Sequence, residues 1–138
     1  MSTSQETNPH FAAIGGGEAI ARLVDRFYHH MDTLPTASRV RALHPPRLGR
    51  VKAIFVHYLI EWMGGPALYS AERGHPRLRR RHMQFPIGAP ERDAWMLCMR
   101  MALSEVVDDL ALRAELDAAF YKIADFICNE PALALSQR

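Results

Sequence analysis

The sequence lacks the features that mark a secreted or membrane-spanning chain. It has no apolar run near the ~18 residues that a transmembrane helix needs. Its first residues, MSTSQETNPHF, do not show the basic-then-apolar order of a signal peptide. Its two cysteines, Cys98 and Cys128, are far apart and fall in helical stretches. We therefore predict a cytoplasmic protein with no membrane partner, whose cysteines are reduced thiols in the core.

Common motifs of metal sites and enzymes are also missing. There is no C-x-x-C, no H-x-x-x-H and no cluster of carboxylates, which argues against a zinc site. There is no G-x-S-x-G, no P-loop and no Rossmann glycine pattern. The net charge of +2 and the pI of about 8.7 are only mildly basic, so charge alone does not argue for nucleic acid.

What the sequence does have is helical periodicity. Its 138 residues suit one domain of ordinary soluble composition, with 49% apolar and 23% charged residues. Apolar residues recur at intervals of three and four in four stretches, at 20–31, 51–63, 95–106 and 112–127. No segment alternates with period two over more than a few residues. The pattern predicts a single all-α domain over residues 1–138, with frayed ends at 1–8 and 131–138.

Glycine and proline separate the predicted helices. These breakers stand at 15–17, 35, 45–46, 64–66, 86, 88 and 90. They leave room for a single turn at 11–14 and a short turn at 39–44. The longest connection runs from 67 to 88 and contains one short helical piece, at 77–83. A long, ordered connection in a small domain is usually functional.

Only a few side chains on this scaffold stand out as candidates for chemistry. Any single one of the seven histidines is more often structural than a ligand. His82 closes the short helix of the long connection, whereas His57 lies off its apolar stripe and is expected to face solvent. Tyr28 and Trp95 lie on apolar stripes, and are ordinary core residues unless buried partners meet their polar ends. The three arginines at 79–81 would normally be a solvated face.

The stretch from Gly64 to Trp95 changes these expectations. It reads GGPALYSAERGHPRLRRRHMQFPIGAPERDAW, and it closely resembles the middle of a group II truncated haemoglobin, the two-over-two helical globin. The resemblance covers about residues 12–129. Further matching pieces, in the family's order and spacing, are IGGGE at 14–18, LVDRFY at 23–28, LHP at 43–45, WMGGP at 62–66, CM at 98–99 and AL at 102–103. Each piece is weak, but together they are specific.

The resemblance implies a haem protein in which two antiparallel helix pairs enclose the haem. Because no C-x-x-C-H motif occurs, we expect non-covalent haem b. His82 matches the proximal ligand of the iron, and its second ring nitrogen should donate to a backbone carbonyl. Tyr28 and Trp95 match distal hydrogen-bond donors, and His44 matches a third distal polar position. The implied set of haem contacts is completed by Val51, Phe55, Tyr69, Arg79, Arg81 and Phe85.

Two of these contacts are expected at the haem propionates. Arg79 and Arg81 match arginines of the family string, and the planar guanidinium suits carboxylates. Tyr69 either reaches a propionate or holds the loop by packing. The distal helix departs from the family pattern. Val51 and Phe55 replace a smaller residue and a leucine, and Ile54 replaces a basic residue, with Lys52 displaced from that position by two.

The resemblance also implies what the pocket does. We expect it to bind O2, NO, CO or peroxide, with Tyr28 and Trp95 donating hydrogen bonds. At ~1–1.5 kcal/mol per hydrogen bond, two donors slow ligand release about a hundredfold. Such slow release disfavours rapid oxygen transport and favours NO oxidation or peroxidase-like chemistry, supplied with electrons by an external reductase.

Two other functions remain open at this point. A gas sensor or scavenger without turnover has the same sequence features. A small helical nucleic-acid-binding module using residues 77–81 is a more distant alternative. The chain is expected to be a monomer or a homodimer.

Overall fold

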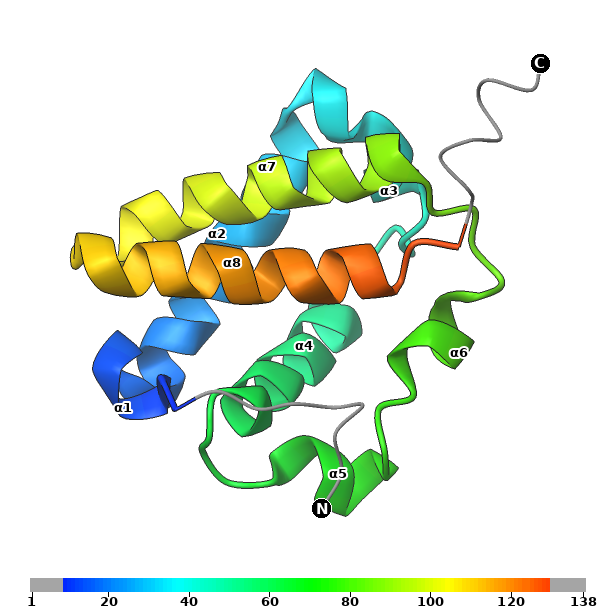
Figure 1. The fold of residues 1–138 in the computed structure, drawn as a ribbon. Coiled ribbons are helices and arrows are strands. Elements are labelled where there is room, and N and C mark those ends of the chain that lie inside the picture. Colours follow the sequence, from blue (N-terminus) through cyan, green and yellow to red (C-terminus); the bar gives the residue numbers. More distant parts are fainter. Residues whose placement is uncertain (1–8, 130–138) are drawn as a thin grey trace.

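The computed structural model describes residues 9–129, and all regular structure in that range is helical (Figure 1). In chain order the elements are α1 (Phe11–Ile14), α2 (Gly16–Thr33), η1 (Pro35–Ala37), α3 (Ser38–Ala42), α4 (Gly49–Trp62), α5 (Leu68–Arg73), α6 (Leu78–His82), α7 (Ala89–Val106) and α8 (Leu110–Phe126). The all-α prediction is confirmed. The fraying expected at 1–8 and 131–138 lies outside the described residues.

The long helices coincide with the predicted apolar stripes and form two antiparallel pairs. α2 packs against α4 and α7, and α7 packs against α8. Figure 1 shows α7 and α8 side by side, running in opposite directions because only residues 107–109 join them. In the same view α2 passes behind this pair, and α4 returns in the direction opposite to α2. This is the expected two-over-two arrangement.

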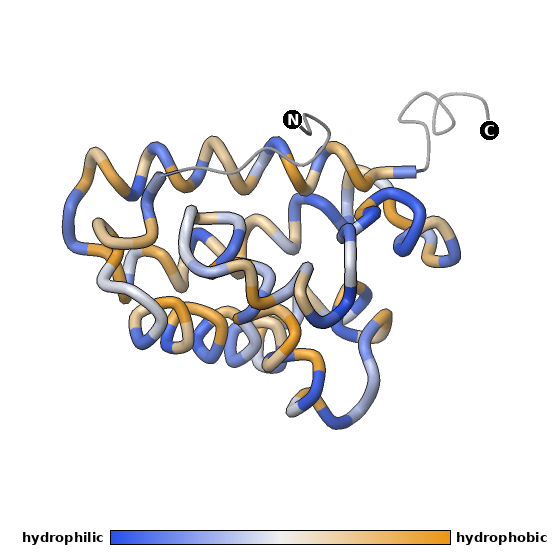
Figure 2. Tube along the Cα trace, turned by 90° about the horizontal axis from the view of Figure 1, so that it is seen from below, coloured by the Kyte–Doolittle hydropathy of each residue, from blue (hydrophilic) through white to orange (hydrophobic). Residues whose placement is uncertain are grey.

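The core lies where the two pairs meet. Phe27 of α2 and Phe120 of α8 are fully buried. Trp95 of α7 meets Phe27 with ring centroids 5.0 Å apart, and Trp62 of α4 meets Phe120 at 4.8 Å. Figure 2 shows hydrophobic and hydrophilic residues following one another along the long helices, as amphipathic helices require. None of the helices between residues 9 and 129 is long and apolar enough to cross a membrane.

Local sequence explains where several helices begin and end. Gly15 between α1 and α2 has φ 115°, in the left-handed region that glycine adopts without strain. α2 ends at Thr33, because Leu34 before Pro35 must be extended. The Asp109 carboxylate accepts hydrogen bonds from two amides in the first turn of α8 and caps that helix. Gly15 and Pro35 thus stand at helix boundaries as predicted, whereas Gly16 and Gly17, which were expected before the helix, lie in the first turn of α2.

The prediction of a single helical piece between 67 and 88 is wrong, because α5 also forms there. Six residues are too few to reveal a helical period in a sequence. The Glu61 carboxylate of α4 accepts the backbone N–H of Ser70 at 2.8 Å and so satisfies a free donor of the first turn of α5. A contact from another helix therefore stabilises α5, which carries Tyr69.

The predicted short helix before Met83 is confirmed as α6. Arg77, just before it, has φ 47°, the only positive φ of a non-glycine residue in the described range. α6 buries none of its residues, and no side chain caps its N-terminus. Its position therefore depends on contacts that other elements supply.

The two cysteines differ in their surroundings. Both are free thiols. Cys98 is buried in the core, and burial raises the pKa of its thiol to about 11. Cys128 is only half-buried beyond the end of α8. The prediction of two core thiols is thus correct for Cys98 and wrong for Cys128.

Candidate functional site

A cavity of about 360 Å³ opens between the two helix pairs and the 67–88 connection. Its walls come from α2, α4, α5, α6, α7 and the end of α8, together with residues 40–45, and they are mostly apolar. Every predicted site residue except Arg79 lines it: Tyr28, His44, Val51, Phe55, Tyr69, Arg81, His82, Phe85 and Trp95. Residues from segments far apart in the sequence are thus brought to one place.

The imidazole of His82 is oriented by its own helix. Its Nδ1 lies 2.6 Å from the carbonyl oxygen of Leu78, one turn earlier in α6. Because a carbonyl can only accept, Nδ1 carries the proton and donates. Nε2 of the neutral ring therefore keeps its lone pair, and the ring lines the cavity. This is the arrangement of a metal-ligating histidine whose second nitrogen is fixed by a backbone carbonyl.

Two hydrogen-bond donors line the same cavity from other helices. Tyr28 of α2 is 4% exposed, and burial raises the pKa of its hydroxyl, which keeps that group protonated. The indole N–H of Trp95, on α7, can only donate. Neither group makes a hydrogen bond to another group in the part of the chain that the structure describes. Phe27 holds both rings in place, with centroids 4.8 Å from Tyr28 and 5.0 Å from Trp95.

His44 lies beside Tyr28, with ring centroids 5.7 Å apart. Its Nδ1 lies 3.0 Å from the carbonyl oxygen of Val40, so Nδ1 is the protonated nitrogen. Burial lowers the pKa of His44, the hydrogen bond to the Val40 carbonyl partly opposes this, and the positive charge of Arg41 lowers the pKa further. In the neutral ring Nε2 is therefore an acceptor. The expectation that His44 is a third distal polar group stays a prediction, with Nε2 as the ring nitrogen left free for it.

α4 forms an apolar wall of the cavity. Val51, Ile54 and Phe55 lie on its inner face. Phe55 also packs against both donors, with its ring centroid 6.2 Å from that of Tyr28 and 6.3 Å from that of Trp95. Lys52 points to the outer face, where its Nζ lies 2.9 Å from Asp25. Because Lys52 is engaged there, α4 presents no basic residue to the cavity.

The two arginines that were expected at propionates occupy different places. Arg81 lines the cavity, is exposed and forms no ion pair within the described residues. Arg79 does not line the cavity. Its Nη1 donates to the carbonyls of Phe126 at 2.8 Å and Cys128 at 3.3 Å, at the end of α8. Both arginines were expected beside the haem propionates, but only Arg81 lies at the cavity.

Sequence reasoning missed much of the wall that α8 and the start of α7 provide. Ile123, Ala124 and Ile127 line the cavity, although their stripe was interpreted only as core. Glu91 also lines it and is 5% exposed. Its carboxylate accepts the N–H of Gly88 at 2.9 Å and pairs with Arg39 at 3.0 Å, so its charge is satisfied. Only the apolar period of α8 could have indicated this wall.

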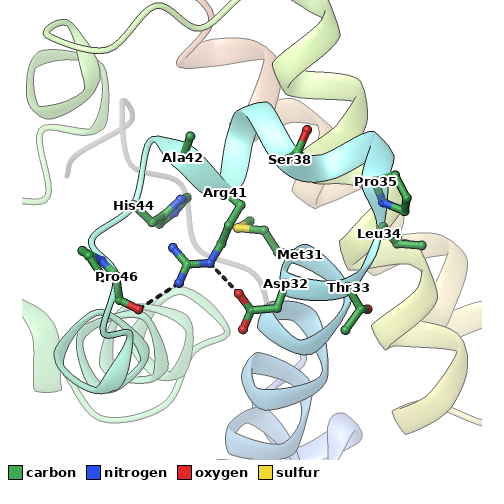
Figure 3. A pocket seen from close by; sticks show the side chains of 10 residues that line it. All are labelled: Met31, Asp32, Thr33, Leu34, Pro35, Ser38, Arg41, Ala42, His44 and Pro46. Atoms are coloured by element: carbon green, nitrogen blue, oxygen red, sulfur yellow. Dashed lines mark hydrogen bonds and ion pairs between the residues drawn. The ribbon is translucent and has the colours of Figure 1, made fainter.

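A second hollow, of about 430 Å³ and open to solvent, lies between the end of α2 and α3 (Figure 3). Arg41 crosses it, paired with Asp32 and donating to the carbonyl oxygens of Pro45 and Pro46, both at 2.9 Å. His44 lines this hollow as well as the larger cavity. Arg41 thus fixes the segment that carries His44, and each of its three guanidinium nitrogens makes one of these contacts.

Tyr69, from α5, is 6% exposed and packs edge to face on Tyr58 with ring centroids 5.7 Å apart. Both tyrosines line the cavity. Packing therefore accounts for the burial of Tyr69, whichever further contact its hydroxyl makes.

Comparison with known proteins places this arrangement in a family. The bacterial-like globin family matches residues 9–129. The chain is 37% identical over 102 residues to the group 2 truncated hemoglobin YjbI of Bacillus subtilis, an alignment that spans 74% of each chain.

Solved structures agree with this match. The group II 2-on-2 hemoglobin of Agrobacterium tumefaciens is 44% identical, with a TM-score of 0.86 over 95% of this chain and 100% of that one. The cold-adapted truncated hemoglobin of Pseudoalteromonas haloplanktis is 37% identical, with a TM-score of 0.86 over 91% and 100%. The truncated oxygen-avid haemoglobin of Bacillus subtilis is 34% identical, with a TM-score of 0.80 over 88% and 100%. The chain therefore belongs to the bacterial-like globins, as a group II truncated haemoglobin, a family that binds haem and diatomic gases.

Proposed function

We propose that the chain binds haem b non-covalently in the 360 Å³ cavity, with Nε2 of His82 as the axial ligand. The observation that carries this assignment is the 2.6 Å hydrogen bond from Nδ1 to the Leu78 carbonyl, which leaves Nε2 unprotonated in a mostly apolar cavity. The mostly apolar walls suit a porphyrin. Exposed Arg81 on the cavity lining suits a propionate.

Haem supplies an iron that binds O2, NO or CO reversibly. The chain supplies the polarity around the ligand. Tyr28 and Trp95 have no competing acceptor in the described structure and donate to the ligand, whereas Val51 and Phe55 exclude water beside it. Two hydrogen bonds of ~1–1.5 kcal/mol each retain O2 about a hundredfold longer. The name of the oxygen-avid relative from Bacillus subtilis agrees with such retention.

Slow release favours chemistry on the ligand over transport. We propose NO oxidation or a peroxidase-like reaction in the cytoplasm, with electrons from an external reductase. A gas sensor or scavenger is the second candidate, because the same two donors would also retain a ligand that is never turned over. Nucleic-acid binding by residues 77–81 loses support, because Arg79 is held by α8 and Arg81 lines the cavity.

Absorption spectra of the purified protein test the haem assignment. We expect a Soret band in the wild type, and loss of at least most of the haem in His82→Ala. His57→Ala is the matched control, because His57 is a partly exposed histidine of α4 that lies off the cavity. Wild-type haem content and spectra in His82→Ala would contradict the assignment. With a reductant supplied, consumption of more than one NO per haem by the oxygenated protein then separates NO oxidation from the second candidate, since a sensor or scavenger shows no turnover.

A further inference from the structure

We propose that Asn129 is a positioning residue for His82, and that with Arg79 it forms a latch between the end of α8 and the proximal segment. This inference rests on the proposed haem site. The latch consists of the side chains of Arg79 and Asn129. Neither side chain lines the cavity, so both act through the residues that do.

The segment that carries His82 needs such a latch. α6 spans Leu78–His82, and a helix this short is not stable alone. It buries no residue and has no side-chain cap. Its approach includes two residues with positive φ, Gly74 at 77° and Arg77 at 47°. The local sequence therefore does not fix where His82 lies.

Asn129, three residues beyond α8, supplies the missing contacts. Its Nδ2 donates to the carbonyls of His82 at 3.0 Å and Phe85 at 2.8 Å. Its Oδ1 accepts the N–H of Ile87 at 3.1 Å, and its backbone N–H donates to the Ile87 carbonyl at 2.8 Å. Both amide hydrogens of the side chain are used. Aspartate has the same shape but neither donor, so asparagine is specifically required.

Arg79 makes the connection in the opposite direction. From α6 its Nη1 reaches the carbonyls of Phe126 at 2.8 Å and Cys128 at 3.3 Å, and its guanidinium lies 5.9 Å from the Phe126 ring centroid. Carbonyls at the end of a helix lack partners within it, and cations there are favourable. The latch therefore holds the chain on both sides of His82, at residue 79 before it and at 82–87 after it.

The consequence is that the end of α8 sets the proximal side of the pocket. The His82 ring is fixed to Leu78 by Nδ1, and its backbone is fixed to Asn129. Ile123 and Ile127 of α8 line the same cavity. The wall and the ligating histidine thus move as one unit, and opening the latch should alter the bond between His82 and the iron.

The test compares Asn129→Asp and Asn129→Ala with Asp109→Ala in the haem-loaded protein. Asp109 is the matched control, since its side chain also hydrogen-bonds two backbone groups, accepting the amides of Ala111 and Leu112 at the opposite end of α8, away from the cavity. We expect the Asn129 variants to lose haem at least about tenfold faster, as the loss of two hydrogen bonds implies. Their iron–histidine stretching band in resonance Raman spectra of the ferrous protein should shift. Asp109→Ala should lower the melting temperature and leave that band unchanged.

An unchanged band and unchanged haem loss in both Asn129 variants would overturn the proposal. If either variant does not fold, Arg79→Gln opens the other half of the latch, and the same two readouts decide. If the wild type takes up no haem, the proposed function fails, and the latch is then tested in the haem-free protein by hydrogen exchange of the Ile87 backbone amide. Amide exchange at Ile87 should then be faster in Asn129→Ala, and unchanged exchange there would exclude the latch.

Discussion

At the scale of the residue, we expect ligand retention to depend on Tyr28 and Trp95, which come from different helices and line the same cavity. Tyr28→Phe and Trp95→Phe each remove one donor with little loss of volume. We expect O2 to dissociate roughly three- to thirtyfold faster in each, for ~0.7–2 kcal/mol lost. Stopped-flow measurement of O2 release checks this. The two effects should not add, because both donors serve one ligand. Unchanged release in both variants would rule out the polar distal pocket.

Phe55 is the second residue whose role can be isolated. It lines the cavity from α4, where the family usually has leucine, and narrows the space beside the ligand. Phe55→Leu should therefore speed CO association, measured by flash photolysis, and change O2 release less than Tyr28→Phe does. Because Phe55 also touches both donor rings, the opposite result is informative. Unchanged CO association with faster O2 loss would mean that Phe55 supports the donors instead of limiting access.

At the scale of the element, a charged cluster ties α2 to α7 away from the cavity. Glu105 of α7 accepts from Arg26 Nε at 2.9 Å and pairs with His30 Nε2 at 3.0 Å. His30 is 6% exposed, whereas the Glu105 side chain is 38% exposed. Hydrogen bonds from Arg26 and then His30 lower the pKa of Glu105 from 4.5 to about 2.

This cluster makes a pH-dependent contribution to stability. A carboxyl whose folded pKa is lowered stabilises the fold above its unfolded pKa, near 4.5, and this is lost as the pH falls through about 2. Glu105→Gln should thus lower the urea midpoint at neutral pH by a small amount, because solvent screens the pair. The difference from wild type should shrink between pH 4.5 and 2. A constant difference in urea midpoint across that pH window would contradict a contribution from the shifted pKa of Glu105. Asp108→Asn is the control, because Asp108 is exposed and has no ion pair within residues 9–129.

At the scale of the whole molecule, the cavity is lined by α2, α4, α5, α6, α7 and α8. A group bound there contacts both helix pairs and binds only the folded chain. Removing haem should therefore lower the melting temperature by about 10 °C or more, as expected for a ligand held well above its dissociation constant. Thermal unfolding followed by circular dichroism, before and after haem extraction, measures this. Adding haemin should raise the melting temperature of His82→Ala much less than that of the wild type. An equal rise in both would mean that residues other than His82 account for the stabilisation.

The sequence by itself determined the helices and most of the pocket. Burial on one side of a helix imposes a period of three and four residues, so the stripes predict the long helices, and Tyr28, Phe55 and Trp95 lie on those stripes. The string around His82 was specific enough to single it out as the proposed axial ligand before any geometry was known. Glycines and prolines marked the ends of the same elements, because their backbone limits are local.

Only the tertiary structure decided how the remaining side chains are used. Arg79 and Arg81 are two residues apart and look alike in sequence, yet one turns to the carbonyls at the end of α8 and the other lines the cavity. Asn129 carries no sequence signal, because its partners at 82–87 lie more than forty residues away. The protonated nitrogen of His44 follows from a single carbonyl nearby. Such roles depend on which elements meet in space, and a local pattern contains no information about that.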